Sequence, residues 1–377
     1  MKVKLESFLQ EVSEKTTENN QYPVLTSSKA GLYLQSDYFN KQVASKDNTG
    51  YKIIKRGQFT YRAMSDTGEF FPNMLDCTDI GIVSPAYPVF EIAKPVVIPE
   101  FLKYYFKSYG FQQSISSFAQ GSTRTSVKYG KLKTVTIDLP EIEEQRKIVE
   151  ILDTAQKLIA HRETEIEKLD DLIKARFVEL FVGKKYEIVK AGSIIKEMRN
   201  GVSPSTSGGH FEKVLTLSAI TQGKFDDKAW KEGFFTDCPS AEKRITEDDF
   251  YICRGNGNKS LVGMGVYALE NRPDLVFPDT VIAAHIDTER MVLPYLWIMW
   301  QQPEVRKQLE SGARTTNGTY KINQKVISEI KIICPPINEQ EVFADFIKQV
   351  NKSKVVAQKM LDEAQTLFDS LMQEYFG

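Results

Sequence analysis

Two long segments of the chain place apolar residues at alternating steps of three and four, the spacing that lines one face of an α-helix. They cover residues 141–183 and 337–377, and neither contains a proline or a glycine before its last residue. Pro140 and Pro336 stand directly before them, where proline fits a helix start. The spacing is that of a heptad, so we expect two long coiled-coil helices. The apolar stripes consist of Ile148, Leu152, Ile159, Ile166, Leu169 and Ile173 in the first segment, and of Phe346, Val350, Met360, Leu367 and Leu371 in the second.

The other two segments, residues 1–140 and 184–336, have a different pattern. Short apolar runs such as residues 51–54 and 214–217 are separated by Gly, Asn, Asp and Pro, which is typical of strands joined by turns. Each segment also has a helix-like stretch near its end. The pattern predicts two mixed α/β domains, each followed by a long helix.

The two halves of the chain resemble each other. Leu-Pro-Glu-Ile-Glu-Glu-Gln at residues 139–145 corresponds to Cys-Pro-Pro-Ile-Asn-Glu-Gln at residues 334–340, and residues 98–101 correspond to 293–296 at the same offset. Several matches in the same order indicate a tandem duplication, and a repeat of this kind decides the whole fold.

Charge separates the segments further. The whole chain has 49 basic and 50 acidic residues, which excludes a uniformly basic nucleic-acid coat. The net charge is +4 in residues 1–140 and +2 in 184–336, whereas it is −4 in 141–183 and −3 in 337–377. A polyanion would therefore meet the globular segments, and the acidic helices would suit a protein partner. The four scattered cysteines and the absence of a long apolar run predict a soluble cytoplasmic protein with no membrane segment.

The sequence contains no recognisable catalytic or metal-binding constellation. The three histidines form neither a zinc motif nor a finger, and neither a phosphate-binding glycine loop nor a nucleophile elbow is present. Cys-Pro-Pro-Ile at residues 334–337 lacks the polar first residue and the aromatic last residue that an amino-methyltransferase would need. We expect no catalytic residue, no metal ligand and no cofactor in this chain.

Three loops are rich in hydrogen-bond donors. Residues 254–259 read Arg-Gly-Asn-Gly-Asn-Lys, and the loops at 121–128 and 312–321 combine Arg, Thr and Lys at equivalent places in the two repeats. Arg and Lys suit phosphates and Asn suits adenine edges, but an Asn-Gly hairpin turn and plain helix-to-strand linkers remain alternatives. The DNA-binding candidates are Arg62, Arg124, Thr125, Lys128, Arg254, Asn256, Asn258, Lys259, Arg314, Thr315, Asn317 and Lys321.

The order of domain, helix, similar domain and helix resembles the specificity subunit of type I restriction–modification systems. The resemblance covers nearly the whole chain and rests on residues 140–145 and 335–340, which open the two helices. Residues 81–87 and 254–258 also support the resemblance. The first helix start departs from the family pattern, because Glu141 stands where a second proline is expected.

The resemblance implies that residues 1–140 and 184–336 are target recognition domains, each reading half of a split DNA site. It also implies that residues 141–183 and 337–377 pair as antiparallel spacer helices with pseudo-two-fold symmetry. The stripe residues would then serve in docking two DNA methyltransferase subunits, which in turn bring restriction and translocase subunits. S-adenosylmethionine, ATP and Mg²⁺ would belong to those partners.

Two other classes of function compete with this interpretation. One is a coiled-coil scaffold that never binds DNA, and the other is a diverged stand-alone DNA methyltransferase or nuclease. The absence of a cofactor motif argues against the second. Sequence-dependent DNA binding would distinguish our interpretation from the first.

Overall fold

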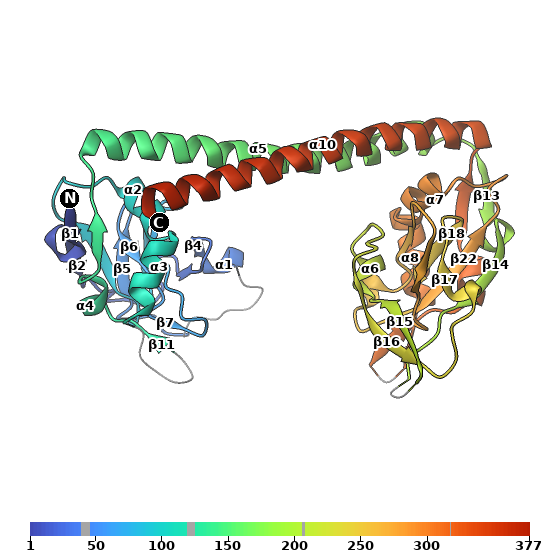
Figure 1. The fold of residues 1–377 in the computed structure, drawn as a ribbon, viewed down its shortest axis with the longest axis horizontal. Coiled ribbons are helices and arrows are strands. Elements are labelled where there is room, and N and C mark those ends of the chain that lie inside the picture. The colour runs from blue at the N-terminus through green and yellow to red at the C-terminus, as the bar shows by residue number, and fades with distance from the viewer. Residues whose placement is uncertain (39–45, 119–124, 206–207, 317) are drawn as a thin grey trace. The chain divides into compact units, whose positions relative to one another are not determined.

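The chain divides into two compact units, which are described here one at a time. The computed structural model describes residues 1–38, 46–118, 125–205, 208–316 and 318–377 (Figure 1). Unit 1 consists of Met1–Thr164 and Gln358–Gly377, and unit 2 consists of Glu165–Ala357. Each unit therefore contains a β-rich body and a part of each long helix.

Unit 1 is built on an antiparallel sheet in the order β2-β10-β6-β8. Its core joins Phe59 and Phe90 of the sheet to Phe106, whose ring meets that of Phe59 edge-on at 5.6 Å between centroids. The strands are β1 (Lys2–Lys4), β2 (Leu9–Val12), β3 (Leu25–Ser27), β4 (Leu32–Leu34), β5 (Lys52–Lys55), β6 (Phe59–Thr60), β7 (Met64–Ser65), β8 (Asn73–Met74), β9 (Ile80–Val83), β10 (Val89–Ile92), β11 (Thr125–Ser126) and β12 (Thr136–Asp138). The helices before the long one are η1 (Leu5–Ser7), α1 (Gln35–Tyr38), α2 (Pro99–Tyr105), α3 (Tyr109–Ser116) and α4 (Tyr129–Leu132).

Unit 2 contains two four-stranded sheets, in the orders β14-β22-β18-β20 and β16-β15-β21-β17. Phe250 of the first sheet packs on Trp300 at 5.6 Å between ring centroids. The strands are β13 (Glu187–Lys190), β14 (Ile195–Asn200), β15 (His210–Leu215), β16 (Trp230–Phe235), β17 (Arg244–Ile245), β18 (Asp249–Cys253), β19 (Gly255–Asn256), β20 (Gly265–Tyr267), β21 (Arg272–Val276), β22 (Val281–Ile286), β23 (Arg314–Thr316), β24 (Thr319–Lys321) and β25 (Lys331–Cys334). The shorter helices are η2 (Ala191–Ser193), α6 (Ser218–Thr221), η3 (Ala241–Lys243), η4 (Lys259–Leu261), α7 (Leu293–Trp300), α8 (Pro303–Gly312) and α9 (Gln324–Glu329).

The topology repeats between the units. The sheet β2-β10-β6-β8 has the same connectivity as β14-β22-β18-β20, and the pair β1-β12 corresponds to β13-β25. Three short helices follow in each unit, α2, α3 and α4 in the first and α7, α8 and α9 in the second. The strand topology therefore carries the duplication that the sequence predicted. The units differ in their additional strands, which form the pairs β3-β4 and β5-β9 in unit 1 and the sheet β16-β15-β21-β17 in unit 2.

The two predicted long helices are confirmed as α5 (Ile142–Phe181) and α10 (Ile337–Phe376), each of 40 residues. Within unit 2 the rings of Phe177 and Phe343 lie 5.7 Å apart, and Lys354 Nζ lies 2.5 Å from a carboxylate oxygen of Asp170. The later residue of α5, Phe177, contacts the earlier residue of α10, Phe343, whereas the earlier Asp170 contacts the later Lys354. The two helices therefore run antiparallel in this unit.

Within unit 1 the first part of α5 and the last part of α10 contact the same core. Ile148 and Leu152 are buried there together with Phe376, and Phe368 and Leu371 pack against them. The mixed α/β fold with paired long helices is thus confirmed.

The stripe predicted for α10 is partly wrong. Met360 is 42% exposed and Leu367 is 51% exposed, although the sequence placed both in the seam. The seam instead uses the following residues, Leu361 and Phe368, which are partly buried. At each place two apolar residues stand side by side, and a heptad fits either one, so the spacing alone cannot select the buried member. In α5 the predicted positions Ile148, Leu152 and Ile173 are buried, while Ile159, Ile166 and Leu169 are half-buried. In α10 Val350 is buried, and Phe346 and Leu371 are half-buried.

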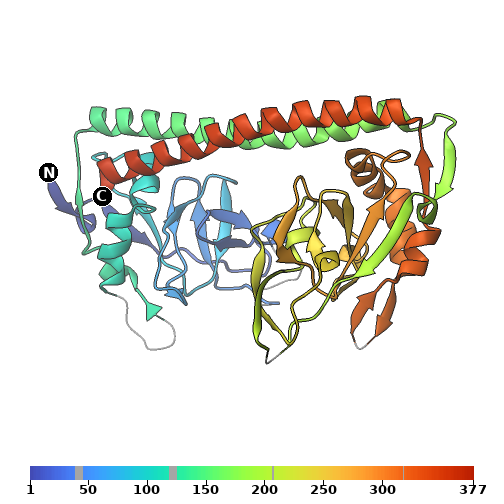
Figure 2. The same cartoon turned by 45° about the vertical axis from the view of Figure 1, so that its right-hand side comes forward.

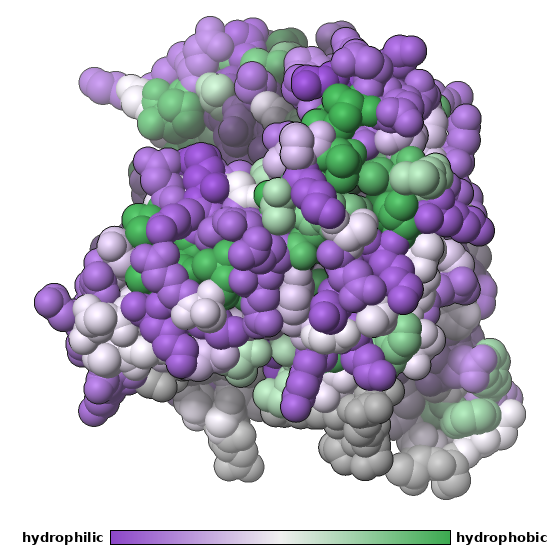
Figure 3. All heavy atoms as spheres, turned by 90° about the vertical axis from the view of Figure 1, so that its left-hand side faces the viewer, coloured by the Kyte–Doolittle hydropathy of each residue, from purple (hydrophilic) through white to green (hydrophobic). Residues whose placement is uncertain are grey.

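Apolar side chains also remain on the outside of the long helices. Val342, Val355 and Leu367 of α10 are 62%, 70% and 51% exposed, and Leu172 of α5 is 47% exposed. The face drawn in Figure 3 is mostly hydrophilic, with separate apolar patches in the upper part of the view. In the part of the chain that the structure describes, no helix combines the length and the apolar character that a membrane span requires.

Candidate nucleic-acid interface

In unit 2 a small three-stranded sheet brings two of the donor-rich segments together. β24 pairs with β19 on one side and with β23 on the other. Lys321 lies opposite both Gly255 and Arg314 in this sheet, and Tyr320 lies opposite both Asn256 and Thr315. Residues that are far apart in the sequence thus form two adjacent rows of one sheet. Since successive residues of a strand alternate between its two faces, Lys321 and Arg314 project on one side, and Asn256, Tyr320 and Thr315 on the other. Figure 2 shows the β23-β24 hairpin at the end of unit 2 that points away from α10.

Local sequence explains why this sheet forms. Gly312 lies so close to Val326 that a Cβ atom would stand 2.3 Å from Cγ1 of that valine, and Gly318 has a φ of +75° in the turn between the strands. Ile322 is buried directly after β24, and its amide donates to the carbonyl oxygen of Arg254 at 2.8 Å. The chain is therefore fixed both before β23, at Gly312, and after β24, at Ile322.

This pairing shows what backbone structure the donor-rich segments of unit 2 adopt. The Asn-Gly dipeptide after Gly255 does not form a two-residue hairpin, because β19 pairs with β24 rather than with the next strand along the chain. The segment around Arg314 is not a plain linker either, because it forms the hairpin β23-β24. Neither result tests DNA contact, and the candidate residues remain predictions.

The polar side chains of the site are held in different ways. The Arg254 guanidinium donates to the carbonyl oxygen of Asp279 at 3.1 Å. Asn256 Oδ1 accepts from the amide of Asn258 at 2.9 Å, and Asn258 Oδ1 accepts from the amide and the hydroxyl of Ser260 at 3.0 and 2.9 Å. Asn258 thereby caps η4, which is a common role for asparagine. The two amides shape the loop with their oxygen atoms.

The cations of this surface point to solvent. Lys259, Arg314 and Lys321 are exposed, as is Thr315. None of the three cations forms an ion pair with a residue that the structure describes. Cations without a carboxylate partner can approach a phosphate without first breaking a salt bridge. This part of unit 2 therefore offers three exposed positive charges on the sheet and on the loop that follows β19.

Unit 1 has a simpler version of the same arrangement. β7 pairs with β11, with Thr125 opposite Ser65, and the Thr125 hydroxyl donates to the Ser65 carbonyl at 3.1 Å. Tyr61 donates from its hydroxyl to the carbonyl oxygen of Val127 at 3.0 Å. The pair lies at the end of unit 1 away from α5 (Figure 1).

The candidate cations of unit 1 flank this pair of strands. Arg62 is exposed directly before β7, and Lys128 is exposed directly before α4. Arg62 lies 3.7 Å from Asp66, and both side chains are about half exposed, so this pair contributes little. Two further candidates, Arg124 and Asn317, lie outside the described residues.

Sequence reasoning missed Tyr320. Tyr320 lies in the middle strand of the sheet, β24, between Asn256 of β19 and Thr315 of β23, and its side chain is half-buried. The signal was present in the alternation Thr319-Tyr320-Lys321, but without the pairing partner nothing linked this tyrosine to the loop sixty residues earlier. Non-local strand pairing was the missing information.

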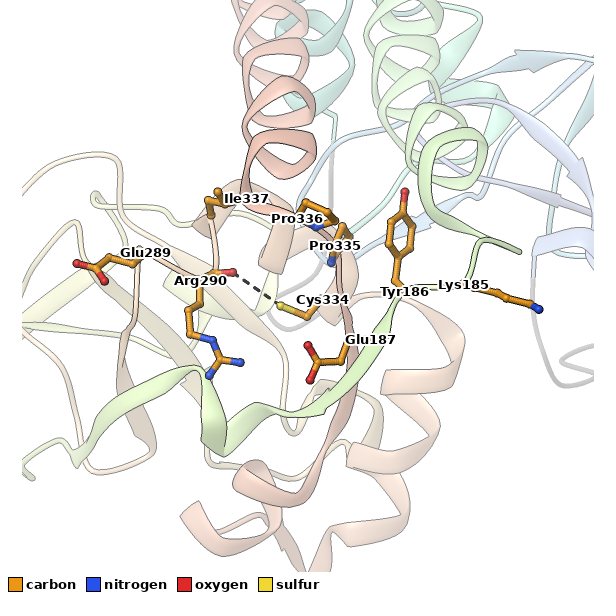
Figure 4. A pocket seen from close by; sticks show the side chains of 9 residues that line it. All are labelled: Lys185, Tyr186, Glu187, Glu289, Arg290, Cys334, Pro335, Pro336 and Ile337. Atoms are coloured by element: carbon orange, nitrogen blue, oxygen red, sulfur yellow. Dashed lines mark hydrogen bonds between the residues drawn. The ribbon is translucent and has the colours of Figure 1, made fainter.

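A separate groove lies at the start of α10, with a volume of about 490 Å³ (Figure 4). Two basic and two acidic side chains line it, and the Cys334 thiol donates to the carbonyl oxygen of Arg290 at 3.8 Å. Burial raises the pKa of this thiol, which disfavours a thiolate. The lining residues are Lys185, Tyr186, Glu187, Glu289, Arg290, Cys334, Pro335, Pro336 and Ile337. In the described ranges no group of three or more His, Cys, Asp or Glu side chains could hold a metal ion.

Comparisons with known sequences agree in the kind of protein they find. A family model described as "Type I restriction modification DNA specificity domain" matches residues 6–170. The type I restriction enzyme EcoKI specificity subunit of Escherichia coli (strain K12) is 24% identical over 303 residues, which are 74% of this chain and 64% of that protein. The type I restriction enzyme HindI specificity subunit of Haemophilus influenzae is 20% identical over 431 residues, covering 92% of this chain and 93% of that protein. The chain thus spans less than two thirds of the first relative and most of the second.

Solved structures resemble the whole chain. A chain from a study of complex assembly and conformational transition of the type I R-M system has a TM-score of 0.61 and 16% identity, and covers 100% of this chain and 97% of its own length. The S subunit of a type I restriction–modification system from M. genitalium has a TM-score of 0.52 and 15% identity, and covers 100% and 96%. At such identities the likeness concerns the fold.

Proposed function

Since the chain belongs to the family of type I restriction–modification specificity subunits, we propose that it reads a bipartite DNA target and is itself the non-catalytic subunit of the complex. Residues 1–140 and 184–336 are the two target recognition domains, and residues 141–183 and 337–377 are the spacer helices. The observation that carries the proposal is the sheet β19-β24-β23, which brings the two donor-rich segments of unit 2 together in one small sheet with exposed cations.

The chemistry of that surface suits double-stranded DNA. Lys259, Arg314 and Lys321 supply positive charge for phosphates, which would orient the domain on the duplex. Asparagine amides can pair with an adenine edge in the major groove. The pair β7-β11, with Arg62 and Lys128, is the counterpart in unit 1. The two surfaces carry different side chains, so the two half-sites should differ in sequence.

The partners follow from the same assignment. The acidic long helices, with their exposed apolar side chains, suit two DNA methyltransferase subunits, through which restriction and translocase subunits join. S-adenosylmethionine, ATP and Mg²⁺ act in those subunits. Because the proposed ligand is DNA inside the host cell, we place the protein in the cytoplasm.

Binding measurements with the purified complex test the proposal. The chain is co-expressed with its methyltransferase subunit, and a random duplex library is selected on the complex, followed by anisotropy titration of the selected duplexes. We expect one selected motif, and affinity at least about a thousandfold above that for unselected DNA at the same salt concentration.

Two outcomes would contradict it. Binding without any sequence preference, or none at all, would favour the scaffold. Methyl transfer or cleavage by the chain alone, with S-adenosylmethionine and Mg²⁺ but no partner, would favour the stand-alone enzyme.

A further inference from the structure

One buried arginine holds the loop that carries Asn258 and Lys259. The loop, residues 257–263, is called loop B here. Arg306 of α8 donates from Nη2 to the carbonyl oxygens of Ser260 and Val262, at 2.8 and 3.0 Å. The Arg306 side chain is only 18% exposed, and its Nη1 is buried with no hydrogen-bond partner among the described residues.

The end of loop B is fixed as well. Trp300 donates from its indole nitrogen to the carbonyl oxygen of Gly263 at 2.8 Å. Gly263 has a φ of +74°, and a Cβ atom there would stand 3.0 Å from a methyl carbon of Leu309. Val262 is fully buried. The loop is thus anchored through its backbone on the side that faces α7 and α8.

The opposite side of the loop is free for contact. The side chains of Asn258, Lys259 and Ser260 are exposed, while the carbonyl oxygen of Ser260 points to Arg306. Fixing the backbone of a flexible loop costs conformational entropy. Fixing the loop before DNA arrives removes that cost from binding and selects one arrangement of its side chains.

Unit 1 uses the same helix position for the same task. Gln112 is the fourth residue of α3, as Arg306 is the fourth residue of α8. Its side chain accepts from the Phe70 amide at 3.1 Å and donates to the Phe70 carbonyl at 2.8 Å, in the loop that follows β7. A hydrogen-bonding side chain therefore holds the equivalent loop in both repeats, although its chemical type differs.

Burying a charged arginine so that it can bond the carbonyl oxygens of a loop costs free energy. This cost argues that the arginine has a specific role. Desolvation lowers the pKa of Arg306 from its usual value, while the Glu310 carboxylate, 3.7 Å from Nη2, acts in the opposite direction. A neutral side chain, such as the glutamine of unit 1, serves the same geometry elsewhere in this chain. Both bonds come from the two N–H groups of Nη2, which the guanidinium fork of Arg306 extends to the Ser260 and Val262 carbonyls.

We propose that Arg306 is a positioning residue for DNA recognition: it fixes loop B so that the exposed side chains of this loop meet one half-site in a single arrangement. This inference rests on the proposed function. It assigns to Arg306 an effect on discrimination between bases in one half-site, and none on the other half-site.

The test uses the full chain in complex with its methyltransferase subunit. Arg306→Gln removes the fork and one charge. The matched control, Lys307→Gln, removes the same charge from the next, exposed position of α8. Arg306→Lys keeps the charge and an N–H donor group but removes the planar guanidinium. Affinity is measured for the selected motif and for duplexes with single-base changes in either half, at several salt concentrations, and the melting temperature of each variant is recorded.

We expect Arg306→Gln to lose about tenfold or more of its discrimination in one half-site, which corresponds to one bidentate base contact. Discrimination in the other half should match that of Lys307→Gln. Arg306→Lys should recover part of the loss. A merely structural arginine would lower the melting temperature without confining the defect to one half-site.

The contrary results are distinct. If the wild-type complex discriminates bases and a folded Arg306→Gln variant equals Lys307→Gln in both halves, the positioning role is overturned while the proposed function stands. A uniform loss across both halves would also overturn it. If the wild-type complex prefers no sequence at all, the proposed function fails, and the positioning role fails with it.

Discussion

Gln145 and Gln340 fix the first turns of α5 and α10 to the β-rich domains that precede these helices. Both side chains are fully buried. Gln340 accepts from the Val292 amide at 3.0 Å and donates to the carbonyl oxygens of Arg290 and Pro335, at 3.1 and 2.8 Å. Gln145 makes the equivalent three bonds in unit 1. The glutamine that ends the repeated sequence motif thus satisfies three backbone groups at once.

Replacing Gln340 by leucine should therefore be costly. Three backbone groups lose their partner in a buried place, so the free energy of unfolding should fall by roughly 2–4 kcal/mol. Urea unfolding followed by tryptophan fluorescence measures it, because the three tryptophans all lie in unit 2. The control is Gln349→Leu, at an exposed position of α10, which should change stability by less than about 0.5 kcal/mol. Equal effects of the two changes would show that the motif glutamine has no special role.

Arg314 tests the phosphate contacts. Changing this exposed arginine to alanine should weaken DNA binding to a similar degree on all sequences, because a phosphate contact carries no base information. The slope of log affinity against log salt should become shallower by about 0.9, the value of one phosphate. Anisotropy titrations between low and moderate salt measure both quantities. An unchanged slope would remove Arg314 from the interface.

Asn258 tests base reading, and its role as a cap determines the design. Asn258→Ser keeps an oxygen that can cap η4 but removes the amide donors. If the amide reads a base, this variant should lose about 1–3 kcal/mol on the selected motif and accept other bases at one position. Asn258→Ala, which removes the cap as well, should add a loss of stability. Full retention of specificity in Asn258→Ser would leave Asn258 as a turn residue.

At the scale of elements, local patterns were sufficient for the long helices. α5 and α10 were predicted to within a few residues of each end because heptad spacing, prolines at the start and the absence of internal breakers all concern neighbours in sequence. The buried face of α10 was not predicted correctly, because either member of the pairs Met360-Leu361 and Leu367-Phe368 fits a heptad. Only packing against unit 1 selects the second member of each pair.

The candidate site was predictable in its residues and not in its assembly. Arg, Asn and Lys identify donor-rich segments from chemistry alone, and the repeat points to equivalent loops. That Asn256 lies opposite Tyr320 depends on pairing between strands about sixty residues apart, which no local pattern encodes. The contribution of Arg306 was hidden for the same reason, because its partners lie on another segment.

The exposure of Met360 and Leu367 allows the partner surface to be tested without unfolding the helix pair. Changing both to aspartate should leave the melting temperature within a few degrees, because neither side chain is in the core. It should weaken association with the methyltransferase at least about tenfold, since a charge would then face an apolar partner surface. Thr366→Asp, beside Leu367 and also exposed, is the control. Pull-down and calorimetry compare them, and normal association of the double variant would move the partner surface elsewhere.

At the scale of the whole molecule, the repeat carries the functional argument. Each repeat has the same core sheet and the same helix positions, and each presents its own short strands with different side chains. α5 and α10 are continuous helices of 40 residues with no proline or glycine in them to bend them. Two reading surfaces joined by stiff helices predict a target with two unlike halves and one fixed gap of unread bases.

Methylome sequencing of a host that carries this chain and its methyltransferase subunit tests this account most directly. The account predicts a single modified motif that consists of two different short sequences separated by a constant number of unspecified bases. Exchanging residues 184–336 for those of a relative should change one half of the motif and leave the other half intact. A continuous palindrome, two halves at varying separation, or a genome without any new modified motif would contradict it.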